Sequence, residues 1–102
     1  MPNPQSPVTL LDVFVVTPEK QQALVDIEIQ ANAVVKRQPG YISATIYRSL
    51  DGTKVTSEMR FESREAFEAM LQNPEIRQFI QQAARVAESF TAVLYEAAFT
   101  DK

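Results

Sequence analysis

The chain has 102 residues, of which 45% are hydrophobic, and this composition is that of one globular domain rather than a disordered chain. It contains no histidine, no cysteine and no tryptophan, so it lacks the commonest general base, the commonest metal and haem ligand, and any thiolate. The net charge is −3 and the ten Lys and Arg are scattered, which argues against a nucleic acid or membrane partner.

The first seven residues, MPNPQSP, contain three prolines but no basic residue and no apolar run. This is not the pattern of a secretory signal, and we expect a flexible leader over residues 1–7, followed by a single domain over residues 8–100. No stretch approaches the roughly 20 apolar residues that a membrane span needs. The sequence therefore predicts a cytoplasmic protein.

A strand is predicted over residues 8–16, VTLLDVFVV, because this run is rich in β-branched and aromatic residues. Both of its alternating faces are largely apolar, which is typical of a central strand covered on both sides. One face carries Leu10, Asp12, Phe14 and Val16. Asp12 is the single charged residue of the run, so it is the first candidate for a functional side chain.

Helices are predicted from capping residues and from apolar positions at helical spacing. The first begins at Thr17, an N-cap residue that precedes proline, and runs to about Arg37. Ser63 caps a second helix, and Asn73 caps a third helical segment that continues to about residue 90. A last strand is predicted over residues 91–100, TAVLYEAAFT.

Two alternating runs between the first and second helices predict a β-hairpin. Asp51-Gly52 predicts a two-residue type I′ turn between them. In the resulting register, the largely apolar face carries Ile42, Ala44, Ile46, Val55, Ser57, Met59 and Phe61. The other face carries Tyr41, Ser43, Thr45, Tyr47, Thr56, Glu58 and Arg60.

The element order is β-α-β-β-α-β, with the second helix broken in two. It predicts an α+β, ferredoxin-like fold: a four-stranded antiparallel sheet with its helices on one face. The apolar hairpin face is expected to lie under the helices. The other sheet face has no covering element within the chain, so we expect a homodimer that packs sheet on sheet.

With this order established, QPGYISATIYRSLDG followed by RFESREAFEAML resembles the antibiotic biosynthesis monooxygenase family, which are small dimeric α+β barrel proteins. The resemblance covers roughly Val8 to Phe99. It implies a cofactor-independent monooxygenase that oxidises a phenolic or polyketide-like aromatic molecule. The substrate itself supplies electrons to oxygen once it is deprotonated, so neither metal nor cofactor is needed.

Catalytic members of this family often place an asparagine on the first strand and a tryptophan just before a Glu-Ser step. The resemblance puts Asp12 and Phe61 at these positions and implies that Phe61 is part of a cavity wall. A cavity carboxylate can act as a base towards a phenol or enol, so Asp12 is the candidate catalytic base. The candidate substrate-binding residues are Phe14, Ser57, Phe61 and Phe79, in an aromatic pocket between sheet and helices. Haem-degrading members add a histidine ligand, which this chain lacks.

Alternatives remain open for both the residue and the protein. Asp12 is either a cavity carboxylate or half of a structural ion pair with an arginine. The arginines considered for that pair are Arg48, Arg60, Arg77 and Arg85. The protein is either a monooxygenase, a non-catalytic module that binds a hydrophobic small molecule, or a structural dimer whose pocket is filled by its own side chains.

Overall fold

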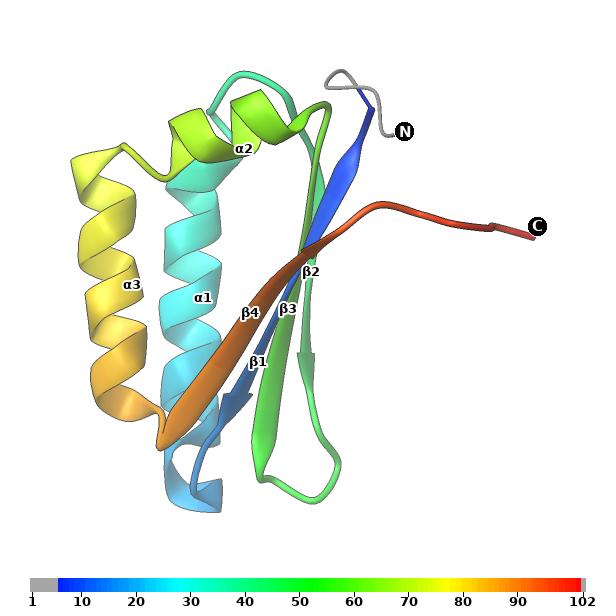
Figure 1. Ribbon diagram of the computed structural model, residues 1–102. Coiled ribbons are helices and arrows are strands. Elements are labelled where there is room, and N and C mark those ends of the chain that lie inside the picture. Colours follow the sequence, from blue (N-terminus) through cyan, green and yellow to red (C-terminus); the bar gives the residue numbers. More distant parts are fainter. Residues whose placement is uncertain (1–5, 102) are drawn as a thin grey trace.

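The computed structural model describes residues 6–101, and its elements follow the predicted order (Figure 1). They are β1 (Val8–Val15), η1 (Pro18–Lys20), α1 (Gln21–Val35), β2 (Tyr41–Arg48), β3 (Lys54–Phe61), α2 (Arg64–Met70), α3 (Pro74–Val86) and β4 (Ser89–Tyr95). Of the leader predicted over residues 1–7, the first five residues lie outside the described part. β4 begins two residues earlier than predicted and ends at Tyr95 instead of residue 100.

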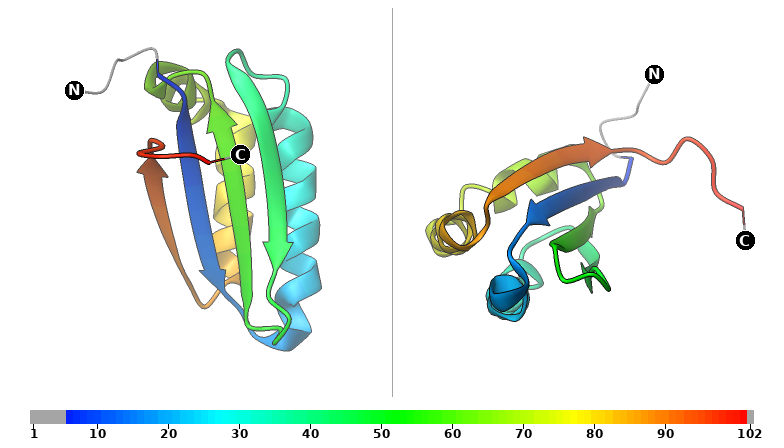
Figure 2. Two further views of the ribbon diagram at one scale, coloured as in Figure 1. Left: turned by 90° about the vertical axis from the view of Figure 1, so that its right-hand side faces the viewer. Right: turned by 90° about the horizontal axis from the view of Figure 1, so that it is seen from below.

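The four strands form one antiparallel sheet in the order β2-β3-β1-β4. All three α-helices cover the same face, and the other face is open (Figures 1 and 2). The left view of Figure 2 looks onto this open face, with the helices behind the strands. The predicted α+β, ferredoxin-like fold is therefore confirmed, with β1 and β3 as its central strands.

The two predicted caps of the second helical layer are present. Ser63 Oγ accepts a hydrogen bond from the N–H of Ala66 at 3.1 Å and begins α2. Asn73 Oδ1 accepts from the N–H groups of Glu75 and Ile76 and begins α3. Thr17 makes no such bond, and a 3-10 turn separates it from α1. These caps satisfy backbone donors that a helix start leaves without partners.

The predicted two-residue turn between β2 and β3 is wrong. Ser49 N–H donates to the Lys54 carbonyl, so the loop that the pair encloses has four residues. Gly52 has a φ of 80°, but no non-glycine residue of the described chain has positive φ, and a type I′ turn requires it at both central residues. Asp51 instead accepts hydrogen bonds from Thr53 and Ser49, which lower the pKa of its carboxyl to about 2.

A register shift at the start of β2 also corrects the predicted faces. Tyr41 pairs with Phe61, and Ile42 is the extra residue of a bulge. Tyr41 therefore faces the helices and packs edge-on against Phe61, with ring centroids 6.0 Å apart. Ile42, predicted to lie under the helices, is 39% exposed. A contact between two segments adjoins this bulge: Gly40 has a φ of 84°, and its carbonyl accepts from Glu62 N–H at 2.7 Å.

The buried core consists of two separate clusters. The first contains Leu10, Val34, Val35, Phe61, Phe67, Met70 and Ile76. The second contains Phe14, Val16, Leu24, Val55 and Ala83. On β1, Asp12 lies between the two clusters, and on β3 its neighbour Ser57 does the same. Glu28 occupies the corresponding level of α1, so a layer with polar side chains divides the core.

Candidate functional site

A cavity of about 180 Å³ lies at this level, between the sheet and the helices. Its walls are mostly apolar and include four phenylalanines: Phe14, Phe67, Phe79 and Phe90. The rings of Phe14 on β1 and Phe90 on β4 are 5.6 Å apart and tilted by 35°. The mouth of the cavity lies between α3 and β4, where three lining residues are exposed: Ile80 at 43%, Phe90 at 47% and Ala92. An aromatic cavity of this kind suits a flat, apolar ligand.

Four lining residues bring polar side chains into the cavity. Asp12 and Ser57 come from paired positions on β1 and β3, so they form part of the sheet wall. Glu28 and Asn32 are four residues apart on α1, which places them one above the other on a single helix face. The cavity therefore has polar groups on two opposite walls within an otherwise apolar lining.

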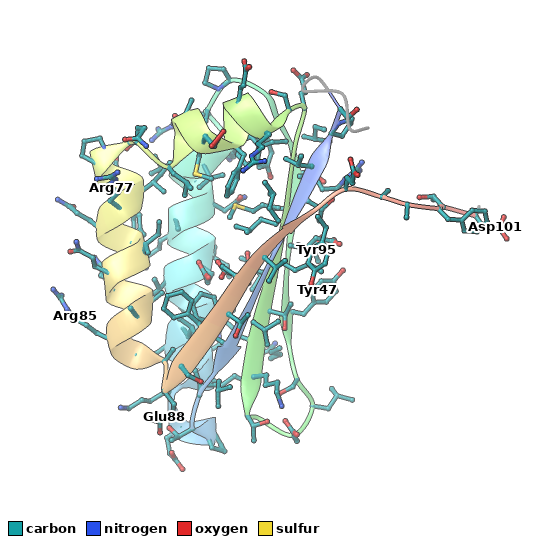
Figure 3. The ribbon with its side chains drawn as sticks, in the orientation of Figure 1. Tyr47, Arg77, Arg85, Glu88, Tyr95 and Asp101 are labelled. Atoms are coloured by element: carbon teal, nitrogen blue, oxygen red, sulfur yellow. The ribbon has the colours of Figure 1, made fainter. Side chains whose placement is uncertain are left out.

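Asp12 has no ion-pair partner in the described chain. Arg48 donates instead to Gln22, and Figure 3 shows Arg77 and Arg85 directed outward from α3, away from the sheet. Arg60 lies on the opposite face of the sheet. One oxygen of Asp12, Oδ1, is buried and accepts no hydrogen bond. The structure thus contains the cavity carboxylate rather than the structural ion pair.

Burial makes both carboxyl groups of the cavity weaker acids. Loss of solvation raises the pKa of Asp12 from 3.8 to about 6. Loss of solvation and, second, the negative charge of Asp12 raise the pKa of Glu28 from 4.5 to about 7. Asn32 Oδ1 is a second buried oxygen without a hydrogen-bond donor.

Three of the four predicted substrate-binding residues, Phe14, Ser57 and Phe79, line the cavity together with Asp12. Phe61 does not. It is fully buried behind the cavity, where it packs edge-on between Tyr41 and Phe67.

The sequence interpretation missed Glu28 and Asn32. Glu28 follows the buried Leu24 by four residues and precedes the buried Ala31 by three, so it shares their helix face. That spacing was a usable signal for a carboxyl group directed inward.

Within residues 6–101, no three Asp or Glu side chains come together as a metal site would require. No helix in this range has the length and the apolar character that crossing a bilayer demands.

Comparison with known proteins places the chain in a family. The model of the antibiotic biosynthesis monooxygenase family matches residues 7–82. The chain belongs to this family. It is also similar to tetracenomycin-F1 monooxygenase of Streptomyces glaucescens, with 37% identity over 70 residues. That match covers 68% of this chain and 62% of the relative.

Solved structures of other proteins share the fold. A monooxygenase from the ActVA-Orf6 gene of Streptomyces coelicolor, in complex with nanaomycin D, superposes with a TM-score of 0.85 at 22% identity, covering 98% of this chain and 95% of that one. SnoaB of Streptomyces nogalater, a cofactor-independent oxygenase, superposes with a TM-score of 0.81 at 20% identity, covering 93% and 96% of the two chains.

Proposed function

We propose that this protein is a cofactor-independent monooxygenase that oxidises a phenolic or polyketide-like aromatic molecule in the cavity, with Asp12 as the base. The observation that carries the proposal is a half-buried carboxylate in the wall of an aromatic cavity: its Oδ1 atom is buried, and it has no ion-pair partner within residues 6–101. Family membership supports the reaction class, and the names of the similar proteins support the substrate class. Phe14, Phe79 and Ser57 are the proposed substrate contacts beside it.

The proposed reaction consumes only the substrate and dioxygen. Asp12 takes a proton from a methylene group that a neighbouring phenol ring activates. The resulting carbanion forms a carbon–oxygen bond with dioxygen, and the peroxide takes the proton back from Asp12. Loss of the second methylene proton breaks the oxygen–oxygen bond and releases water, which leaves a carbonyl group on the substrate. The cavity assists by excluding water and holding the reacting atoms together.

Oxygen uptake tests the proposal. The purified protein is mixed with a panel of anthrones and phenols, and dioxygen consumption is followed with an electrode. We expect consumption of one dioxygen per carbonyl formed, without added metal, flavin or reductant. Binding of these compounds without any oxygen uptake would instead establish the non-catalytic module that binds a hydrophobic small molecule.

The same proposal includes a second copy of the chain. The open sheet face carries exposed apolar side chains, among them Tyr47, Val93 and Tyr95 at 50%, 39% and 49% exposure. Figure 3 shows Tyr47 and Tyr95 on the side of the sheet away from the helices. A homodimer through this face buries them and completes the dimeric α+β barrel architecture of the family.

A further inference from the structure

We propose that Glu28 is a second functional carboxyl group of the cavity: it lies opposite Asp12 and donates a hydrogen bond to the substrate oxygen on which negative charge develops. This inference rests on the proposed function, because it assigns a role in that reaction. It concerns a residue on α1, whereas the proposed base lies on β1.

The two carboxyl groups approach the cavity from opposite sides. Asp12 belongs to the central strand of the sheet wall, and Glu28 belongs to the helix that packs across it. A flat ring that fills the cavity between sheet and helix therefore has one carboxyl group on each side. One of them can remove a proton from the ring system while the other contacts an oxygen substituent.

No cation competes for this pair within the described chain. The inner faces of β3 and β4 contribute Ser57, Met59, Phe90 and Ala92 to the lining, and α2 and α3 contribute only apolar side chains. On β2 the lining residues are Ala44 and Ile46, and the one charged side chain farther along the same face, Arg48, is exposed and bonded to Gln22. The two carboxyl groups therefore influence each other more than any third group does.

This arrangement gives the two carboxyl groups, Asp12 and Glu28, different roles. Two carboxylates that face each other in a poorly solvated cavity do not both ionise at neutral pH. Burial raises the pKa of both groups, and the negative charge of Asp12 raises that of Glu28 further, so ionised Asp12 holds the proton on Glu28. Asp12 is then the base, and the Glu28 O–H donates a hydrogen bond to the phenolate or enolate oxygen. The proton stays on Glu28 throughout, so no extra reactant is needed.

Asn32 adds a second anchor on the helix wall. Its Oδ1 atom is buried without a donor and lies one helical turn from Glu28. A ligand hydroxyl satisfies this oxygen, whereas an ether or a carboxylate does not. The preferred substrate therefore carries one oxygen that accepts from Glu28 and one hydroxyl that donates to Asn32.

The protonation states of Asp12 and Glu28 can be measured in the absence of substrate. Carboxyl carbons labelled with a stable isotope are titrated by NMR in the wild-type protein and in Asp12→Asn. We expect two coupled titrations near neutral pH in the wild type, and a lower pKa for Glu28 once the charge of Asp12 is gone. Asp26→Asn is the matched control, because Asp26 is exposed on the same helix and outside the cavity lining. Ordinary, independent titrations of both groups in the wild type would overturn the proposal.

Substitutions of Glu28 distinguish a hydrogen-bond donor from a base. Glutamine keeps the shape of a protonated glutamate and its ability to donate, so Glu28→Gln is expected to retain kcat within about threefold and to lose the decline of the rate above neutral pH. Glu28→Leu removes the donor and is expected to lower kcat by about a hundredfold. Loss of activity in Glu28→Gln, with the fold intact by circular dichroism, would show that Glu28 is a base and would overturn the assigned role.

Ligand binding distinguishes failure of this inference from failure of the proposed function. A dihydroxynaphthalene and its dimethyl ether are titrated calorimetrically into the wild type, Glu28→Leu and Asp26→Asn. We expect the diol to bind at least about tenfold more tightly than the ether to the wild type and Asp26→Asn, and equally to Glu28→Leu. Absence of oxygen uptake together with this preference would refute only the oxygenase. Equal binding of diol and ether to the wild type would refute the donor role of Glu28, whatever the enzyme does with oxygen.

Discussion

Asp12 is the proposed base, and its substitution by asparagine is expected to stabilise the folded protein. Its pKa is raised in the folded protein, so the folded state binds more protons than the unfolded state between pH 3.8 and about 6. Stability therefore falls as the pH rises through that window. Asp12→Asn is expected to raise the free energy of unfolding on the order of 2 kcal/mol at about pH 8, while it abolishes oxygen uptake.

Chemical denaturation at two pH values checks this expectation. At about pH 3.5 the carboxyl group is largely protonated in both states, so the stability gain is expected to vanish there. Ser57→Ala serves as the comparison, because it alters the paired position on β3 without removing a charge. A substitution of Asp12 that lowers the melting temperature and leaves activity unchanged would end the catalytic proposal.

The inward direction of Asp12 could be predicted from the sequence, but that of Glu28 and Asn32 on α1 could not. Strand alternation assigns a face to every residue of β1, so an isolated carboxyl among apolar neighbours is conspicuous. The buried face of a helix is a broad stripe without strict alternation, so a polar residue near its edge is normally assigned to the solvent-exposed face. Glu28 and Asn32 occupy the edge of that stripe, where only the position of the facing strands decides the direction of the side chain.

At the scale of elements, Gly40 lies in the loop between α1 and β2 and packs closely against α2. It has a φ of 84°, and a Cβ atom there would lie 2.5 Å from the Cβ of Ala66 on α2. Gly40→Ala is expected to lower the free energy of unfolding by at least about 2 kcal/mol. Gly52→Ala has a similar φ of 80° but a nearest contact of 3.2 Å, to Pro18, so its loss is expected to be about 1 kcal/mol.

A double substitution isolates the contact from the backbone strain. In the Ala66→Gly background the contacting Cβ atom is absent, so Gly40→Ala is expected to be less harmful there by about 1 kcal/mol. Urea denaturation of the four proteins in the cycle gives this coupling energy. Equal losses in both backgrounds would show that the clash with α2 contributes nothing.

The cap of α3 offers a second test at this scale. Asn73 Oδ1 accepts two backbone hydrogen bonds, at 2.9 and 3.3 Å, and α3 carries Phe79 and Ile80 into the cavity wall. Asn73→Ala is expected to lower stability by about 1 kcal/mol, and Asn73→Asp is expected to restore it. A loss of the same size in both variants would indicate that the cap bonds are not the cause.

Element order and capping were predictable because they depend on local signals: alternation, cap residues and proline position. The hairpin details were not. The loop at Asp51-Gly52 is closed by side-chain hydrogen bonds of Asp51, which replace the type I′ turn that the dipeptide predicts. The bulge at Ile42 depends on how Gly40 approaches Glu62, a contact between segments that sequence spacing does not encode.

For the whole molecule, the divided core is expensive. Side chains leave a cavity of about 180 Å³ between sheet and helices, so its lining residues lose packing contacts that a filled core would provide. A domain of this size is stable by only about 5–15 kcal/mol in total. The cavity also holds two oxygens without donors, on Asp12 and Asn32. This arrangement favours a protein that binds a ligand over a structural dimer whose pocket is filled by its own side chains.

A homodimer is expected to form through the sheet face that the helices leave open. Val13 lies near the middle of β1, flanked across the open face by Thr56 and Thr91, while Tyr47 and Tyr95 stand on the outer strands. Light scattering at micromolar concentration is expected to report twice the chain mass of 11.5 kDa. Two-fold symmetry brings each substituted side chain close to its copy, so a charge introduced at the centre is repelled within a poorly solvated interface.

Val13→Glu is therefore expected to weaken the dimer by about a hundredfold or more in dissociation constant, measured by sedimentation over a concentration series. Leu50→Glu introduces the same charge at the fully exposed tip of the β2–β3 loop, outside the sheet face, and is expected to leave the dimer intact. Because Val13 faces away from the cavity, the monomer that forms is expected to keep its affinity for the dihydroxynaphthalene within about threefold. A wild-type protein that sediments as a monomer would refute the sheet-on-sheet dimer, and dissociation by Leu50→Glu but not Val13→Glu would place the interface elsewhere.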